Sequence, residues 1–148
     1  MVWKKVLLIS ALFVSIVAFA SKESNSTTKI DSGDKIVLLY VDDNACRYCR
    51  ELDMMLQEGK AKELIDKHFI IRRVMLNEDL YLPEGLPPPF GTPTVYFLDQ
   101  NEEALIEPMR GEKTKEDLIL FLEEAIREKR QQDGNASGNS FWDKLFGK

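Results

Sequence analysis

Blocks of apolar residues recur along the chain at spacings that predict alternating strands and helices. Residues 36–41 are apolar at every position, which is typical of a strand buried on both faces of a sheet. Apolar residues then return at helical spacing from residue 47 until Gly59 interrupts, and again over residues 61–69. A further apolar run at residues 69–76 predicts a second strand. The order strand, helix, strand favours a parallel crossover and therefore an α/β fold.

Proline and glycine divide the second half of the chain. Residues 83–93 hold five of the six prolines, so this segment is expected to be a stiff loop that serves either as a spacer or as the rim of a binding site. A strand is predicted at residues 95–98, followed by a turn and an antiparallel partner at residues 104–109. Thr114 is expected to cap a last helix whose apolar stripe covers one face of the sheet.

The first 20 residues have the three parts of a secretory signal. Two lysines precede an apolar stretch, and Ala18-Phe19-Ala20 supplies a small-x-small cleavage site. The apolar stretch is shorter than the roughly 20 residues of a membrane span, so cleavage is favoured over retention as an anchor. We therefore expect the protein to reach the periplasm or to be secreted, where conditions are oxidising.

The remaining sequence suits one compact domain between two polar ends. Residues 21–34 have almost no apolar side chains and are expected to form a flexible linker. Residues 131–148 are rich in Gly, Ser and Asn, which predicts a disordered tail, and they end in a short apolar cluster at residues 141–146. The folded domain is therefore expected to comprise residues 35–130.

Charge narrows the range of partners. The 148-residue chain has a formal net charge of −5, and its basic residues do not cluster outside the extreme N-terminus. A nucleic-acid-binding protein needs a basic surface, so nucleic acid is excluded as a partner. Nothing in the composition calls for a second domain or a second subunit, and we expect a monomer.

The candidate chemistry lies at Cys46 and Cys49, the only two cysteines in the sequence. They follow the first strand and open the first helix, where the helix macrodipole stabilises a thiolate. Arg47 and Arg50 add positive charge nearby. Tyr48 could offer a hydroxyl group near the site, but a rim aromatic is the favoured interpretation. This arrangement predicts that Cys46 is an exposed nucleophile with a lowered pKa and that Cys49 resolves the mixed disulfide.

Two other interpretations of the cysteine pair remain open. The thiolates could bind a soft ion such as Cu(I), or bridge a cluster between two subunits, with Met54 or Met55 as a further ligand. The pair could also form a purely structural disulfide, although so short a loop contributes little closure entropy. We favour redox exchange, with no cofactor and no resident metal. His68, the single histidine, fits a packing residue better than a catalytic base.

The cysteine pair and the later Gly91-Thr92-Pro93-Thr94 segment together resemble the thioredoxin-like superfamily over residues 35–129. Within that superfamily, the chain looks most like exported thioredoxin-related proteins of the SoxW type. The resemblance implies a central mixed sheet flanked by helices. It also implies that a cis Pro93 packs against the disulfide, that the backbone at Thr92 and Pro93 binds the client chain, and that exchange proceeds through a mixed disulfide.

The sequence also departs from thioredoxin itself. Arg47 and Tyr48 replace the Gly-Pro dipeptide between the cysteines, and Tyr40 and Met75 stand where thioredoxin has a buried aspartate and a buried lysine. Both buried charges are therefore expected to be absent. The resulting hypothesis is a thiol-disulfide oxidoreductase that reduces or exchanges disulfides in exported client proteins, with a membrane electron relay as a candidate electron donor.

Overall fold

The computed structural model describes residues 34–77 and 79–146, so the predicted signal and nearly all of the predicted linker lie outside the described residues. The elements, in chain order, are β1 (Ile36–Asp42), α1 (Arg47–Leu56), α2 (Gly59–His68), β2 (Phe69–Met75), β3 (Thr94–Leu98), β4 (Met109–Arg110) and α3 (Lys115–Phe146). In the part of the chain that is described, each helix is too short or too polar to cross a membrane.

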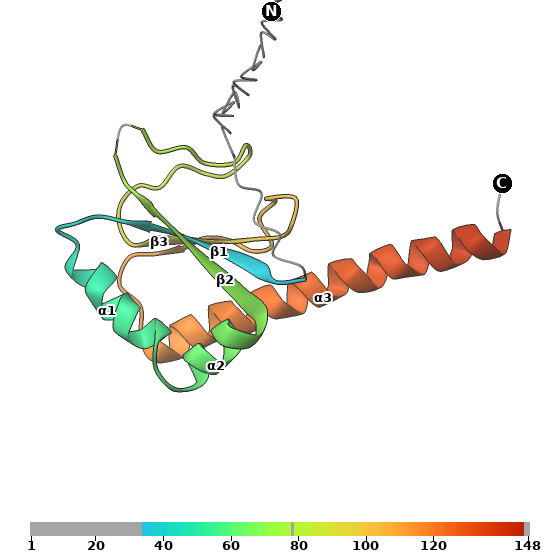
Figure 1. Ribbon diagram of the computed structural model, residues 1–148, viewed down its shortest axis with the longest axis horizontal. Coiled ribbons are helices and arrows are strands. Elements are labelled where there is room, and N and C mark those ends of the chain that lie inside the picture. Colours follow the sequence, from blue (N-terminus) through green and yellow to red (C-terminus); the bar gives the residue numbers. More distant parts are fainter. Residues whose placement is uncertain (1–33, 78, 147–148) are drawn as a thin grey trace, which may run out of the picture. The chain divides into compact units, whose positions relative to one another are not determined.

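The four strands form one mixed sheet in the order β2-β1-β3-β4. Strand β1 is parallel to β2 and antiparallel to β3, and β4 is antiparallel to β3. This confirms the predicted α/β architecture and the parallel crossover through α1 and α2. Figure 1 shows β1 inside the sheet and the three helices gathered on one side of it.

Residues 36–41 of β1 are all apolar because both faces of the sheet are covered. Alternate β1 side chains enter two separate hydrophobic clusters. The cluster under the helices contains Ile36, Leu38 and Tyr40, together with residues of α1, α2 and α3. The cluster on the opposite face contains Val37, Leu39 and Val41, packed against Leu80, Leu82 and Leu86. These leucines belong to residues 79–93, which include the predicted stiff loop and are called the proline-rich loop from here on. That loop therefore covers the sheet face that carries none of the described helices (Figure 1).

Aromatic side chains connect the sheet to the helices in the first cluster. Phe97 of β3 is fully buried. Its ring meets Phe69 edge-on with centroids 6.4 Å apart, and it stacks on Phe121 of α3 at 6.0 Å. These contacts place one side chain at the junction of β2, β3 and α3.

Helix α3 begins with the predicted cap. The Thr114 hydroxyl oxygen accepts the backbone N–H of Asp117 at 3.1 Å, and the Asp117 carboxylate accepts the backbone N–H of Thr114 at 3.1 Å. These hydrogen bonds, the backbone one first, lower the pKa of Asp117 below its usual value. Leu118, Leu122 and Ala125 then enter the core, as the apolar stripe predicts.

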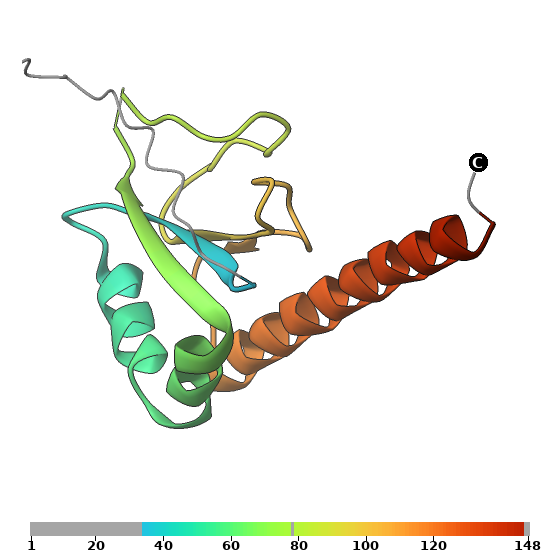
Figure 2. The same cartoon turned by 45° about the vertical axis from the view of Figure 1, so that its right-hand side comes forward.

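Two predictions from the sequence need correction. Residues 131–146 continue α3 instead of forming a disordered tail, because extending an established helix is far easier than starting one (Figure 2). The Lys129 to Asp133 pair, one turn apart, supports this extension. The strand expected at residues 104–109 is reduced to a single bridge at Ala104 and the two residues of β4. Pro108 has no N–H to donate, which prevents a continuous ladder there.

Candidate functional site

Cys46 and Cys49 are joined by a disulfide at the start of α1. Cys46 is the N-cap residue, with extended backbone angles, and its Sγ accepts the backbone N–H of Cys49 at 3.1 Å. The preceding turn is held by Asp43, whose carboxylate accepts the N–H of Ala45 at 2.8 Å and whose carbonyl accepts the N–H of Cys46 at 3.1 Å. The Cys46 sulfur therefore already receives one of the unpaired N–H groups at the helix N-terminus, which would stabilise a thiolate.

The two sulfur-bearing residues differ in exposure. Cys49 is 2% exposed and belongs to the core cluster under the helices. Cys46 is half-buried at the edge of that cluster. An incoming disulfide would therefore meet Cys46 before Cys49.

Tyr40 supports the buried cysteine from the sheet. It is fully buried in β1, and its hydroxyl group donates a hydrogen bond to the carbonyl oxygen of Cys49 at 3.0 Å. Burial, followed by the nearby charges of Asp53 and Asp42, raises the pKa of Tyr40 well above its usual value. The phenol thus stays protonated and remains a hydrogen-bond donor over the physiological pH range.

A carboxylate also lies beside the disulfide. One Asp42 oxygen and the two cysteine sulfurs all lie within 4.8 Å of one another. The Asp42 side chain is only 14% exposed. Its oxygens accept the backbone N–H of Asp43 at 2.7 Å and a guanidinium N–H of Arg73 at 2.5 Å. These two hydrogen bonds hold the carboxylate in place at the carboxyl end of β1.

Arg73, on the neighbouring strand β2, holds this arrangement together. Its guanidinium binds Asp53 of α1 through two hydrogen bonds and also binds Asp42. It lies 4.5 Å above the ring of Tyr40, in cation–π contact. The hydrogen bonds to Asp53 are the largest cause of the raised pKa of Arg73. Two carboxylates and one guanidinium give this cluster a formal net charge of −1, and Asp42 is the member that lies beside the cysteine sulfurs.

Pro93 lies at the same end of the sheet. The Thr92–Pro93 peptide bond is cis, as predicted. Thr94 pairs with Val41, so Pro93 follows that register toward Asp42 at the end of β1. The carbonyl oxygen of Pro93 accepts the N–H of Gly111 at 2.9 Å, which ties the proline to the segment after β4.

The two residues between the cysteines are on the surface. Arg47 is exposed and donates a hydrogen bond to Glu51, one turn further along α1, at 3.0 Å. That hydrogen bond is the main cause of the raised pKa of Arg47. Because Glu51 offsets the charge of Arg47, the field of this arginine at Cys46 is weaker than the sequence suggests. Tyr48 is 40% exposed, which agrees with a position at the rim.

No protein-family model matches the chain, and no curated protein matches it. Among solved structures, it is similar to the crystal structure of disulphide isomerase from Xylella fastidiosa Temecula1. The two share 24% sequence identity and superpose with a TM-score of 0.50, over 60% of this chain and 76% of the other. The chain has a thioredoxin-like fold.

Within this thioredoxin-like fold, Tyr40 and Met75 occupy the usual places of the two buried charges, so those charges are absent, as the sequence predicts. The structure instead brings two partly exposed charged groups to the site, the Asp42 carboxylate and the Arg73 guanidinium. The sequence does indicate that Asp42 lies near the site, because Asp42 is two residues from Tyr40 and therefore on the same face of β1. Arg73 can be assigned to the site only when the parallel register of β1 and β2 is known, because that register pairs it with Tyr40.

Asp42→Asn is expected to raise the reduction potential of the cysteine pair. The substitution removes the net negative charge near the Cys46 thiolate and so stabilises the reduced protein. The effect is on the order of 1 kcal/mol, or roughly 20 mV for a two-electron couple. Equilibration with glutathione buffers measures the potential. Glu107→Gln, the same charge change at an exposed site, serves as the control, and an unchanged or lower potential in the Asp42 variant would contradict this role.

A metal-binding alternative gains little from the site. Among the described residues, the acidic or histidine side chain whose ligand atom lies near both cysteine sulfurs is that of Asp42. Its carboxylate oxygen is a hard ligand, whereas Cu(I) prefers soft ligands such as sulfur. Met54 is exposed, and Met55 packs against the core. His68 is half-buried at the end of α2, where burial is the main cause of its lowered pKa.

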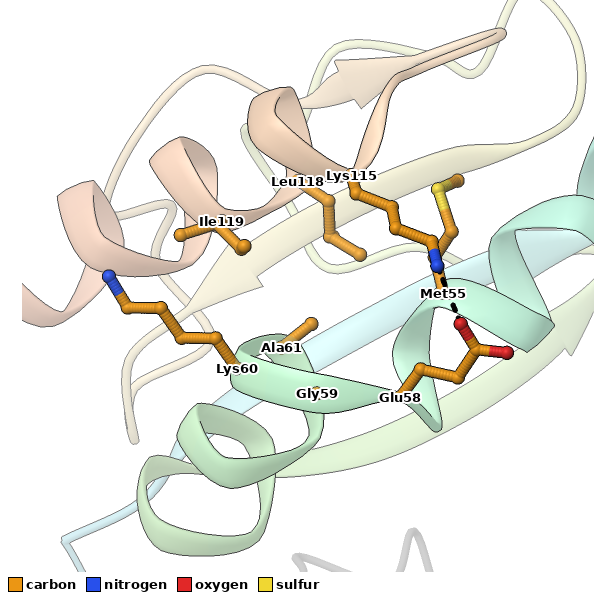
Figure 3. Close-up of a pocket in the computed structure, with 8 residues that line it drawn as sticks. All are labelled: Met55, Glu58, Gly59, Lys60, Ala61, Lys115, Leu118 and Ile119. Atoms are coloured by element: carbon orange, nitrogen blue, oxygen red, sulfur yellow. Dashed lines mark hydrogen bonds and ion pairs between the residues drawn. The ribbon is translucent and has the colours of Figure 1, made fainter.

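A separate cavity of about 220 Å³ lies between the turn joining α1 to α2 and the start of α3 (Figure 3). It is lined by Met55, Glu58, Gly59, Lys60, Ala61, Lys115, Leu118 and Ile119. The Lys115 ammonium group donates a hydrogen bond to the Glu58 carboxylate at 2.6 Å beside it, so these two charges satisfy each other. The cavity contains neither cysteine, and we assign it no part in the exchange chemistry.

Proposed function

We propose that this protein is an exported thiol-disulfide oxidoreductase that exchanges disulfides with client proteins through Cys46 and Cys49. The observation that carries the proposal is the disulfide at the N-terminus of α1, between a half-buried N-cap cysteine and a fully buried one. The position of the cis Pro93 at the same end of the sheet supports it.

The proposed reaction has two steps. The Cys46 thiolate attacks one sulfur of a client disulfide, so that a Cys46–client disulfide forms and the other client sulfur leaves as a thiolate that takes up a proton. The Cys49 thiol then loses its proton and attacks the Cys46 sulfur. This step restores the protein disulfide and releases the second client thiolate, which is protonated in turn. Two electrons pass from the protein to the client.

Four further residues have supporting roles in this proposal. Thr92 and Pro93 bind the client backbone beside the cysteine pair, as the resemblance implies. Arg47 and Tyr48 adjust the Cys46 thiolate and the surface around it, with the charge of Arg47 reduced by its bond to Glu51.

Reduction or exchange of client disulfides is the favoured direction. The helix N-terminus stabilises the reduced protein and favours an oxidant. The charges of Asp42, Arg73 and Asp53 act in the opposite sense, because their net negative charge destabilises a nearby thiolate. Electrons would be supplied by a donor such as a membrane relay, and the predicted secretory signal supports a location in the periplasm or outside the cell.

Reduction of insulin disulfides tests the proposal. With dithiothreitol as electron source, the protein is expected to accelerate precipitation of the insulin B chain well beyond the rate with dithiothreitol alone. The Cys46→Ser, Cys49→Ser double variant is expected to give no acceleration. Equal rates for the two proteins would overturn the proposal. Stoichiometric Cu(I) in the purified wild-type protein, without insulin reduction, would favour the metal-binding alternative.

A further inference from the structure

A second hollow lies at the end of the sheet that carries the cysteine pair. It has a volume of about 220 Å³ and is lined by Phe90, Gly91, Thr92, Thr94, Arg110 and Gly111. Thr94 pairs with Val41 of β1 on one side and with Arg110 of β4 on the other. The hollow therefore shares Thr92 with the segment proposed to bind the client backbone.

Arg110 is the charged group of this hollow. Arg72 and Arg110 are the half-buried arginines of the described residues, and Arg72 forms an ion pair with Glu102 at 2.9 Å. The Nε atom of Arg110 is buried and has no hydrogen-bond partner, and the described residues provide no carboxylate for its guanidinium. A half-buried guanidinium without a carboxylate partner is unfavourable, so an acidic ligand in the hollow would be stabilised.

The field of Arg110 also reaches the neighbouring strand. Burial raises the pKa of Tyr96, and the positive charge of Arg110 opposes that rise. The remaining walls of the hollow carry no charge, and Phe90 at its rim is 85% exposed. A planar cation beside an apolar, uncharged wall matches a carboxylate on a short aliphatic side chain, because guanidinium and carboxylate can pair through two parallel hydrogen bonds.

The distance to the cysteine pair indicates where on a client that carboxylate would lie. Strand β4 is two strands away from β1, after which the cysteine pair follows, and strands are about 4.8 Å apart, so the axes of β4 and β1 are separated by about 10 Å. An extended chain advances about 3.3 Å per residue. A side chain roughly three residues from the attacked client cysteine would therefore reach Arg110.

We propose that this hollow is a client subsite in which Arg110 binds an Asp or Glu side chain located about three residues from the client cysteine. The inference rests on the proposed oxidoreductase function and adds a preference for acidic client segments. It gives the protein a means of choosing among exported disulfides that does not depend on the cysteine pair itself.

Matched peptide substrates test the subsite. Each peptide carries a glutathione mixed disulfide on its cysteine and has either Glu or Gln two, three or four residues away, on either side. With the reduced wild-type protein, kcat/KM is expected to be about tenfold higher for the best Glu peptide than for its Gln partner. In Arg110→Gln this preference is expected to disappear, so that the ratio of the two kcat/KM values falls to about one.

Two further variants distinguish a specific contact between Arg110 and the client carboxylate from a general electrostatic attraction of acidic peptides to the protein. Arg50→Gln removes an exposed positive charge from α1 and is expected to keep the Glu preference. Arg110→Lys retains the charge without the planar fork and is expected to keep only part of the preference. The subsite is overturned if the wild-type protein shows no preference, if Arg110→Gln retains it, or if Arg50→Gln loses it equally. Failure of the oxidoreductase function is distinct, because then neither peptide would be reduced.

Discussion

Cys49→Ser is expected to trap client proteins as stable mixed disulfides with Cys46. The substitution removes the neighbouring thiol that would resolve the intermediate, so release must wait for a thiol from solution. Because an intramolecular attack has a high effective concentration, multiple-turnover reduction of insulin should slow by more than about 100-fold. Non-reducing electrophoresis followed by mass spectrometry of the adduct measures the trapped species.

Cys46→Ser is the matched control for this trap. Its remaining thiol belongs to Cys49, which is 2% exposed and faces the core. It should therefore form little or no adduct under the same conditions. Iodoacetamide labelling of the reduced wild-type protein across pH gives a second measurement, with Cys46 expected to react first. If the Cys46→Ser variant is the one that traps clients, the order of the two cysteines is reversed.

Phe97→Ala is expected to lower the free energy of unfolding by about 3–5 kcal/mol. The side chain is fully buried and contacts Phe69 of β2 and Phe121 of α3, so its removal leaves a cavity where three elements meet. Urea unfolding of the oxidised proteins, followed by circular dichroism, measures the change. The lost stability should appear as a lower midpoint at an unchanged slope.

Phe90→Ala provides the same chemical change at a surface position. Phe90 is 85% exposed, so the substitution should alter the free energy of unfolding by no more than about 0.5 kcal/mol. Similar losses in the two variants would mean that the stacked aromatic rings do not contribute to the core in the way that the contacts indicate.

The local sequence pattern was sufficient to predict the structural features that depend on a single segment of the chain. Strand β1 is evident from its unbroken apolar run because both of its faces are buried. The position of Cys46 at a helix N-terminus follows from the polar break after that strand. The cap at Thr114 follows from the spacing of Thr114 and Asp117, which bond to each other reciprocally.

Features that depend on pairing between distant segments could not be predicted from the local sequence pattern. Arg73 reaches Asp42 across 31 positions of sequence, and only the parallel register of β1 and β2 aligns it with Tyr40. Arg110 meets Thr94 through a ladder of two residue pairs, too short to leave an alternating pattern in the sequence. The helical extension of α3 contradicts its local composition, since residues rich in Gly and Asn are poor helix formers.

The proline-rich loop is constrained in two ways at once, which bears on how relatives of this protein would diverge. Its Leu80, Leu82 and Leu86 shield the face of the sheet that lacks helices, while Tyr81 and Phe90 point into solvent with exposures of 76% and 85%. Inward positions are expected to accept only exchanges among apolar residues. Outward positions are free to change with each lineage's clients, so sequence variability along this loop should alternate between the two sets.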